Sequence, residues 1–527
     1  MKKILYNARI NTLDIDLPNA SALVIENGKL VAVGDAEIIL TEFGNYPKQD
    51  MGGKFILPGL TDAHLHLQYY GMGLQKVDCE TRSLVECIQR VAKRVQETES
   101  GEWVLGHGWN QNNWAEGFGS SAMLDVISSI HPIYLTAKSL HAAWANSEAL
   151  KRAGISASTP DPENGRIVRD DKGEPTGILL EDAMYLVSQE IPEPEIETLA
   201  KILQQAQTEL WKMGLTGIHD FDRRNCFSAL QLIHSRGELG LRVLKNIPVE
   251  DLPHAIGMGL RSGFGDDYLR IGSLKLFADG ALGPHTAAML EPFVDESKNY
   301  GILNLDKEQI FEYGSKAVDN GFSLAVHAIG DRANHEVLDG FMQIRKYEKM
   351  KAYPHFRHRI EHVQLLHPSD TSRLAELDLI ASMQPIHAPS DLFMAEKSWG
   401  ERSAFSYAWR TQLDHGARLA FGSDAPVESP NPFWGLHAAV TRQRADGSPG
   451  ESGWYPEQRL TVEEALHGFT QGPAYAAGME NKSGKLREGF LADLIVLDQN
   501  LFECDPSELI NIKPLATMVG GEWVWEV

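Results

Sequence analysis

The chain has 527 residues, of which 43% are hydrophobic and 23% are charged, and it carries a formal net charge of -23 at pH 7. This composition is typical of a globular protein. The acidic balance excludes a nucleic acid or an anionic membrane as the main partner, because both require basic surface. The four cysteines lack metal-type spacing, so we expect a reducing, cytoplasmic environment without disulfides. We also expect no signal peptide and no membrane span, because no apolar run is long enough.

Both ends of the chain predict short strands. Near the N-terminus, two β-rich runs flank Asn27-Gly28, which is the strongest short hairpin signal. Near the C-terminus, "GKLREGFLADLIVLD" and "ATMVGGEWVWEV" are also strands with glycine turns. We therefore expect residues 1–57 and 479–527 to form one small β-sandwich module together.

Between the two ends, strand and helix patterns alternate. Helical stretches such as "PEIETLAKILQQAQTELWKMG" separate eight candidate strands, which cover 53–60, 216–221, 241–248, 271–277, 323–330, 359–364, 379–386 and 418–424. Eight such units predict an α/β fold, a (β/α)₈ TIM barrel over residues 58–478. A doubly wound open sheet is the alternative, but the chain lacks the glycine fingerprint of a nucleotide site.

The first two barrel strands are separated by about 150 residues, where one crossover needs only a few tens. An insertion of about residues 70–192 therefore follows the first strand. It contains "WVLGHGWNQNNW", a helical "NSEALKRAG" and a turn-rich hairpin, "NGRIVRDDKGEPTGIL". Because the loops after barrel strands open onto the catalytic face, we expect the insertion to cover and shape the site.

The stretch "TDAHLHL" places two histidines at the end of the first barrel strand. Side chains alternate along a strand, so Asp62, His64 and His66 face the same way. Further polar residues end the later strands and should face the barrel axis; these are Lys275, His327, His362 and Asp424. A single histidine at a strand end is more often structural. Four histidines and one carboxylate at one barrel mouth instead indicate Zn²⁺ or a similar divalent ion.

Two positions in this set raise questions of their own. An inward-facing His362 turns Glu361 toward the helices, where the sequence offers it no partner. Lys275 is costly inside a barrel unless it is paired, for example with Asp279. Alternatively, burial lowers its pKa, and the neutral amine takes up CO₂ to form a carbamate that can bridge two cations.

The order His-x-His, Lys, His, His, Asp resembles the amidohydrolase superfamily of metal-dependent hydrolases. The segments "GKFILPGLTDAHLHL", "LKLFADGALG", "AVHAIGDRAN", "RIEHVQ" and "GSDAPVESPNP" are similar to the branch that includes N-substituted formamide deformylases, and the similarity extends over almost the whole chain. It implies two divalent ions, Zn²⁺ or Mn²⁺, bridged by a hydroxide and a carboxylated lysine. By this resemblance, His64, His66 and Asp424 hold the first ion, His327 and His362 hold the second, and Lys275 bridges them.

The resemblance also implies that the enzyme cleaves a non-peptide amide by metal-activated hydroxide, with Asp424 as the proton carrier. A mononuclear deaminase would not need Lys275. A lactonase or esterase would use the same residues, so the sequence separates it poorly from an amidase. A non-catalytic metal-binding or scaffold protein would be expected to have lost ligands.

Residues for substrate binding are sought in the insertion and after the seventh strand. The candidates are Trp109, Trp114 and His141, with Asn110 and Trp144 nearby, and His387 at the barrel mouth. The alternative for the tryptophans is that they form the core of the insertion itself. The expected partner is a small amide-type molecule, and the sequence is compatible with a homo-oligomer.

Overall fold

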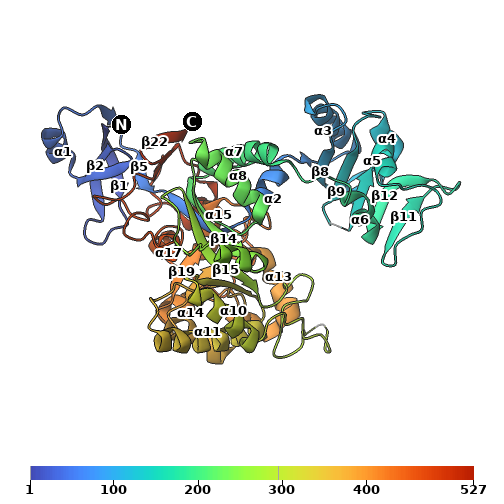
Figure 1. Ribbon diagram of the computed structural model, residues 1–527. Coiled ribbons are helices and arrows are strands. Elements are labelled where there is room, and N and C mark those ends of the chain that lie inside the picture. Colours follow the sequence, from blue (N-terminus) through green and yellow to red (C-terminus); the bar gives the residue numbers. More distant parts are fainter. Residues whose placement is uncertain (1, 140, 295) are drawn as a thin grey trace. The chain divides into compact units, whose positions relative to one another are not determined.

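The computed structural model describes residues 2–139, 141–294 and 296–527 (Figure 1). The chain divides into two compact units. Unit 1 comprises the N-terminal segment up to Tyr70 together with Leu199–Val527, and unit 2 comprises Gly71–Thr198. Each unit has its own sheets and its own hydrophobic clusters.

The larger part of unit 1 is a barrel of eight parallel strands, in agreement with the predicted (β/α)₈ fold. Each strand pairs with the next along the chain. The strands are β6 (Leu60–Leu65), β13 (Leu215–Asp220), β14 (Arg242–Pro248), β15 (Leu269–Phe277), β16 (Leu324–Ala328), β17 (Arg359–His362), β18 (Ile380–Met383) and β19 (Arg418–Phe421).

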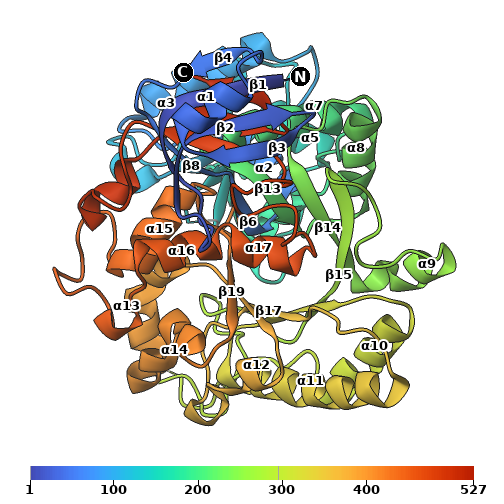
Figure 2. The same cartoon turned by 90° about the vertical axis from the view of Figure 1, so that its left-hand side faces the viewer.

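Helices follow the barrel strands, and α10, α11 and α14 lie along the lower edge of Figure 2. Their amphipathic patterns bury one face against the sheet, as in α7, where the buried positions recur at helical spacing. The helices are α2 (Leu67–Leu74), α7 (Ile196–Lys212), α8 (Arg224–Ser235), α9 (Leu252–Gly257), α10 (Lys307–Asp319), α11 (Asp331–Lys351), α12 (Arg373–Glu376), α13 (His387–Trp399), α14 (Trp409–Asp414), α15 (Pro432–Thr441), α16 (Val462–Gly468) and α17 (Gln471–Ala476).

The first and last strands close the barrel just where the predicted ligands stand. The backbone N–H of Asp424 donates to the carbonyl of His64 at 2.7 Å, and that of His66 donates to the carbonyl of Ala425 at 2.9 Å. The buried carboxylate of Asp62 accepts from the backbone N–H of His64 at 2.9 Å and from that of Ser423 at 3.1 Å. We call this junction between the ends of β6 and β19 the barrel seam. Its hydrogen bonds hold the backbones of His64, His66 and Asp424 in place.

The predicted first strand, 53–60, is in fact divided between two sheets. Its apolar part forms β5 (Phe55–Pro58), and the barrel strand β6 begins only at Leu60. The prediction missed the break because Pro58 and Gly59 sit inside a continuous apolar run. A Cβ at Gly59 would lie 2.3 Å from the side chain of Thr216, so only glycine allows the chain to pass this close to β13.

Both ends of the chain build one mixed sheet, as expected for the composite β module. Strand β5 pairs with β20 in antiparallel register, and the Asn27-Gly28 turn has positive φ at both residues, which suits a two-residue hairpin. Helix α1 (Ala36–Glu42) follows the third strand. The other strands are β1 (Lys2–Asn11), β2 (Asn19–Glu26), β3 (Lys29–Gly34), β4 (Lys48–Asp50), β20 (Leu494–Leu497), β21 (Ala516–Val519) and β22 (Glu522–Glu526).

Unit 2 is built on a six-stranded sheet in the order β11-β12-β10-β9-β8-β7. The predicted hairpin is β11–β12, and the predicted helix is α5. The strands are β7 (Val77–Asp78), β8 (Val104–Trp109), β9 (Ile133–Ala137), β10 (Ala142–Ala145), β11 (Gly165–Arg169) and β12 (Pro175–Glu181). The helices are α3 (Leu84–Glu97), α4 (Ser121–Asp125), α5 (Ser147–Arg152) and α6 (Tyr185–Ser188). Among the described residues, no helix combines the length and the apolar character needed to cross a membrane.

Because the backbones pack closely at the barrel seam, we expect a single added methyl group there to destabilise the protein. A Cβ at Gly422 would lie 2.4 Å from the backbone nitrogen of His64, an atom that cannot rotate away. We expect Gly422→Ala to lower the free energy of unfolding by about 1–3 kcal/mol through overpacking, measured by urea denaturation. Gly34→Ala is the matched control, because no atom lies within 4 Å of its added Cβ. Equal stability of the two variants would contradict this account of the seam.

Candidate metal centre

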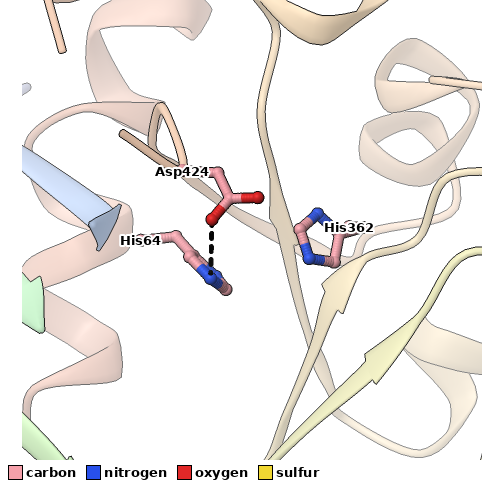
Figure 3. A group of neighbouring side chains, drawn as sticks. All are labelled: His64, His362 and Asp424. Atoms are coloured by element: carbon pink, nitrogen blue, oxygen red, sulfur yellow. Dashed lines mark ion pairs between the residues drawn. The ribbon is translucent and has the colours of Figure 1, made fainter. Parts of the chain in front are cut away.

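The predicted metal ligands come from the carboxyl-terminal ends of different barrel strands and meet at one place. Ligand atoms of His64, His362 and Asp424 all lie within 4.8 Å of one another (Figure 3). The Nε2 atoms of His64 and His66 are each 3.4 Å from Oδ1 of Asp424. The ring of His327 lies 4.6 Å from that of His362, between centroids. The arrangement therefore gathers four imidazoles around one carboxylate.

Each imidazole uses one ring nitrogen for a hydrogen bond within the protein. Such a bond fixes the tautomer and leaves the other nitrogen available to a metal. For three histidines the bonded atom is Nδ1: His64 pairs with Glu361 Oε2 at 2.7 Å, His66 with Asp222 Oδ1 at 3.1 Å and His362 with Gln384 Oε1 at 2.8 Å. His327 differs, because its Nε2 donates to the carbonyl of Gly280 at 2.8 Å. Its free nitrogen is Nδ1.

Glu361 does not face the helices, and that expectation was wrong. His362 has φ of 73°, outside the strand region, so the alternation of sides stops at the end of β17. Glu361 is fully buried, and its carboxylate contacts both His64 and the guanidinium of Arg359, whose Nε lies 2.5 Å from Oε1. Arg359 also donates to the carbonyl of Ala63 at 2.7 Å. A buried ion pair thus supports the first histidine.

Lys275 faces the barrel interior as expected, but it is not paired with Asp279. Its Nζ is buried and lacks a hydrogen-bond partner among the described residues. The rings of Phe221 and Phe277 lie 4.8 and 4.6 Å from this atom. Burial lowers the pKa of Lys275 to about 8. Asp279 instead accepts three backbone N–H groups, among them that of Gly330 at 2.8 Å.

The protonation of the imidazoles differs across the centre. Burial lowers the pKa of His64 to about 4 and that of His327 to about 3, so both are neutral at pH 7 and able to bind a cation. Burial also acts to lower the pKa of His66, but the neighbouring carboxylates of Asp222 and Asp424 raise it to about 9. For Asp424, burial is outweighed by the neighbouring imidazoles, which hold its pKa well below the usual value.

A second cluster of potential ligands lies beside the centre. Ligand atoms of Asp220, Asp222 and Cys226 are also within 4.8 Å of one another, and all three residues are buried. However, Nζ of the buried Lys245 lies 2.8 Å from Asp220 Oδ2. This ammonium already supplies the positive charge, so the cluster reads as an ion pair rather than as a metal site.

The predicted substrate residues of the insertion all belong to unit 2. Trp109 and Trp114 are buried together with Trp144 in its hydrophobic core. The ring centroids of Trp109 and Trp114 are 6.1 Å apart. This burial agrees with the alternative that the tryptophans form the core of the insertion. His141 is exposed, and its Nδ1 lies 2.9 Å from a carboxylate oxygen of Glu181. A substrate role for these residues stays a prediction.

His387 stands at the barrel mouth in unit 1. It is buried at the start of α13, and its ring is stacked 6.2 Å from that of His362. Its Nε2 lies 3.2 Å from the carbonyl oxygen of Ser423, next to Asp424. The structure thus brings His387 to the candidate metal ligands, while its contact with a substrate remains a prediction.

Sequence reasoning missed the residues that support the ligands. Asp222 follows the end of β13, and Gln384 follows the end of β18, so both stand where the other site residues were sought. A search for every polar residue at a strand end would have found these two. Arg359 carries no such signal, because it is the first residue of β17.

The pKa values predict how the stability of the metal-free protein depends on pH. The pKa values of His64 and His327 lie below the usual 6.5, so their contribution is complete above pH 6.5 and is lost as the pH falls toward 4 and 3. The pKa of His66 lies above 6.5, so its contribution is complete below pH 6.5 and is lost as the pH rises through 9. We expect the melting temperature of the metal-free protein to be highest near pH 6.5.

The control for this profile is His66→Gln, which should remove the decline on the alkaline side and keep the acid one. A melting temperature that rises steadily from pH 6.5 to 9 in the unmodified protein would refute the assignment to His66.

Comparison with known proteins identifies the family. The model of the amidohydrolase family matches residues 49–525. Two relatives are each 31% identical to the chain: Protein LONG AFTER FAR-RED 3 of Arabidopsis thaliana, over 99% of this chain and 91% of its own, and the putative amidohydrolase YtcJ of Bacillus subtilis, over 100% of both. An N-substituted formamide deformylase of Arthrobacter pascens is 27% identical over 98% of this chain and 97% of its own.

A solved structure gives the same result. An uncharacterized metal-dependent hydrolase from Pyrococcus furiosus superposes with a TM-score of 0.80 at 30% identity, covering 95% of this chain and 100% of that chain. The family match spans both the barrel and the strands that bear the gathered ligands. The chain therefore belongs to the amidohydrolase family of metal-dependent hydrolases.

Proposed function

We propose that the protein hydrolyses the C–N bond of a non-peptide amide and releases a carboxylic acid and an amine. The observation that carries this proposal is the position of Asp424, whose Oδ1 lies 3.4 Å from the Nε2 atoms of two histidines at the barrel mouth. A carboxylate held there can act both as a ligand and as a proton carrier. The similarity to an N-substituted formamide deformylase supports the choice of an amide.

The gathered residues fit two divalent ions, Zn²⁺ or Mn²⁺. His64, His66 and Asp424 would hold the first ion, and His327 and His362 the second, each imidazole through the nitrogen that its hydrogen bond leaves free. When bound, such ions lower the pKa of a shared water to near neutrality and polarise the substrate carbonyl. Both the free nitrogens and the partly buried carboxylate of Asp424 suit this role.

Lys275 would bridge the ions as a carbamate formed with CO₂. Its buried Nζ has no hydrogen-bond partner among the described residues, and its lowered pKa favours the neutral amine that reacts with CO₂. The carbamate replaces this unsatisfied amine by a carboxylate that two cations can share. A mononuclear deaminase would leave Lys275 without a purpose, so the lysine favours the two-ion hydrolase.

Asp424 carries the proton through the reaction. Its carboxylate accepts a proton from the attacking water as the water oxygen bonds to the carbonyl carbon. It then donates this proton to the nitrogen as the C–N bond breaks, so the amine leaves neutral.

A hydrolysis screen tests the proposed reaction. The purified protein, supplied with Zn²⁺ or Mn²⁺ and bicarbonate, is given formylated, acetylated and cyclic amides, each beside the ester or lactone of the same shape. We expect turnover of amides. Turnover confined to esters and lactones would instead favour the lactonase or esterase alternative, and metal binding without any turnover would favour a scaffold protein.

Replacing Asp424 should remove the proton carrier and one ligand. We expect Asp424→Ala to retain its fold and to lose about 10²–10⁴-fold in kcat, measured at saturating substrate with metal content determined on the same sample. The matched control is Glu451→Ala, which removes an exposed carboxylate. Near-normal turnover by a metal-loaded Asp424→Ala variant would rule out the proposed mechanism.

Replacing Lys275 tests the carbamate. Lys275→Ala should lose most activity, and added formate or acetate should restore part of it by supplying the missing carboxylate. Lys275→Arg should remain inactive with and without these acids, because a guanidinium stays charged and repels cations. Activity retained by Lys275→Arg would show that no carbamate is needed.

A further inference from the structure

The candidate centre has two halves, one with His64 and His66 and the other with His327 and His362. They differ in the groups that accept hydrogen bonds from these histidines. The acceptors for His64 and His66 are carboxylates, while the acceptors for His362 and His327 are an uncharged amide and a backbone carbonyl. All four bonds lie between 2.7 and 3.1 Å, so the halves differ in charge rather than in geometry.

The carboxylate behind His64 is rigidly held. Glu361 receives two contacts from Arg359, at 2.5 Å to Oε1 and 3.0 Å to Oε2, while Oε2 also meets His64. Both partners are within 1% of complete burial. A carboxylate buried and paired in this way cannot rotate away from the imidazole, so its oxygen remains the hydrogen-bond acceptor of His64.

The carboxylate behind His66 is held equally well by different groups. Besides meeting His66, Asp222 accepts the backbone N–H of Gln68 through Oδ2. The ammonium of Lys245 binds the backbone carbonyl of Asp222 and the side chain of Asp220. Asp222 is 1% exposed. The two carboxylates are thus independent of each other in sequence and in their supporting contacts.

In the opposite half, the hydrogen-bond acceptors of His362 and His327 are uncharged. Gln384 presents Oε1 to His362, and its own Nε2 is buried without a partner among the described residues. His327 Nε2 bonds the carbonyl of Gly280 at 2.8 Å. A carboxylate oxygen of Asp279 lies farther from this nitrogen, at 3.5 Å, and this carboxylate already accepts three backbone N–H groups. A neutral acceptor orients an imidazole but raises its basicity less than a carboxylate does.

We propose that the ion held by His64 and His66 binds more tightly than the ion held by His327 and His362, so that the centre fills and empties in a fixed order. This inference rests on the two-ion centre of the proposed function. The groups responsible are Glu361 and Asp222, which act as positioning residues behind the ligands. Outer carboxylates of this kind contribute about 10–100-fold to metal affinity.

The order can be measured on the full-length, metal-free protein with Zn²⁺ alone. Titration in a chelator-buffered solution should give two dissociation constants separated by about 10–100-fold. His66→Ala should abolish the tighter constant and His362→Ala the weaker one. Two equal constants, or the reverse assignment, would overturn the inference. Binding of a single ion by the unmodified protein would instead refute the two-ion centre itself, and the inference with it.

Exchange of the acceptors gives the sharper comparison. Asp222→Asn should weaken only the tighter constant, and Gln384→Glu should strengthen only the weaker one, so the two constants converge from opposite sides. Glu361→Gln repeats the first test at His64, in case one variant fails to fold. The melting temperature of each metal-free variant separates a loss of affinity from a loss of fold. Equal changes of both constants in Asp222→Asn, or no change in either variant, would overturn the inference.

Discussion

The closure of the barrel between β6 and β19 is the constraint on which the site depends. Residues from the first and last strands come together only when the barrel closes. Here two backbone hydrogen bonds close it, from Asp424 to His64 and from His66 to Ala425. The carboxylate of Asp62 ties the same two strands by accepting from the His64 and Ser423 backbones. The backbone atoms that close the fold are therefore those of the residues proposed to carry the proton and hold the first ion.

Much of the barrel could be predicted because its signals are local. Alternation of side chains along each strand placed Lys275 and His327 on the inner face, and the helical stretches between strands set the order of the units. The split of the first strand was not predicted, because an apolar run has the same pattern whether its residues belong to one sheet or to two. What divides it is the close approach of Gly59 to Thr216, two residues that the sequence does not relate.

The candidate site could be predicted only as far as its innermost residues. Histidines and carboxylates at strand ends carry a recognisable pattern, but their supporting groups depend on contacts across the barrel. Glu361 shares the inner face of β17 with Arg359, and His362 reaches the same site only because its backbone departs from the strand conformation, which no residue type indicates. The tryptophans of the insertion are a different case, because large rings predicted to bind a substrate can equally well form a hydrophobic core, as they do in unit 2.

The composite sheet ties the start of the chain to its end, and this has a consequence for synthesis. Strand β5 finds its partner β20 only when Leu494 has been made, since Pro58 and Leu494 are paired in the register of the two strands. At a synthesis rate of roughly 5–20 residues per second, β5 remains without its partner β20 for on the order of 20 to 90 s. Throughout that interval, β5 presents an apolar edge with unpaired backbone groups, which is the kind of surface that chaperones cover. A sheet that joins such distant strands thus leaves β5 without this partner until β20 has been synthesised.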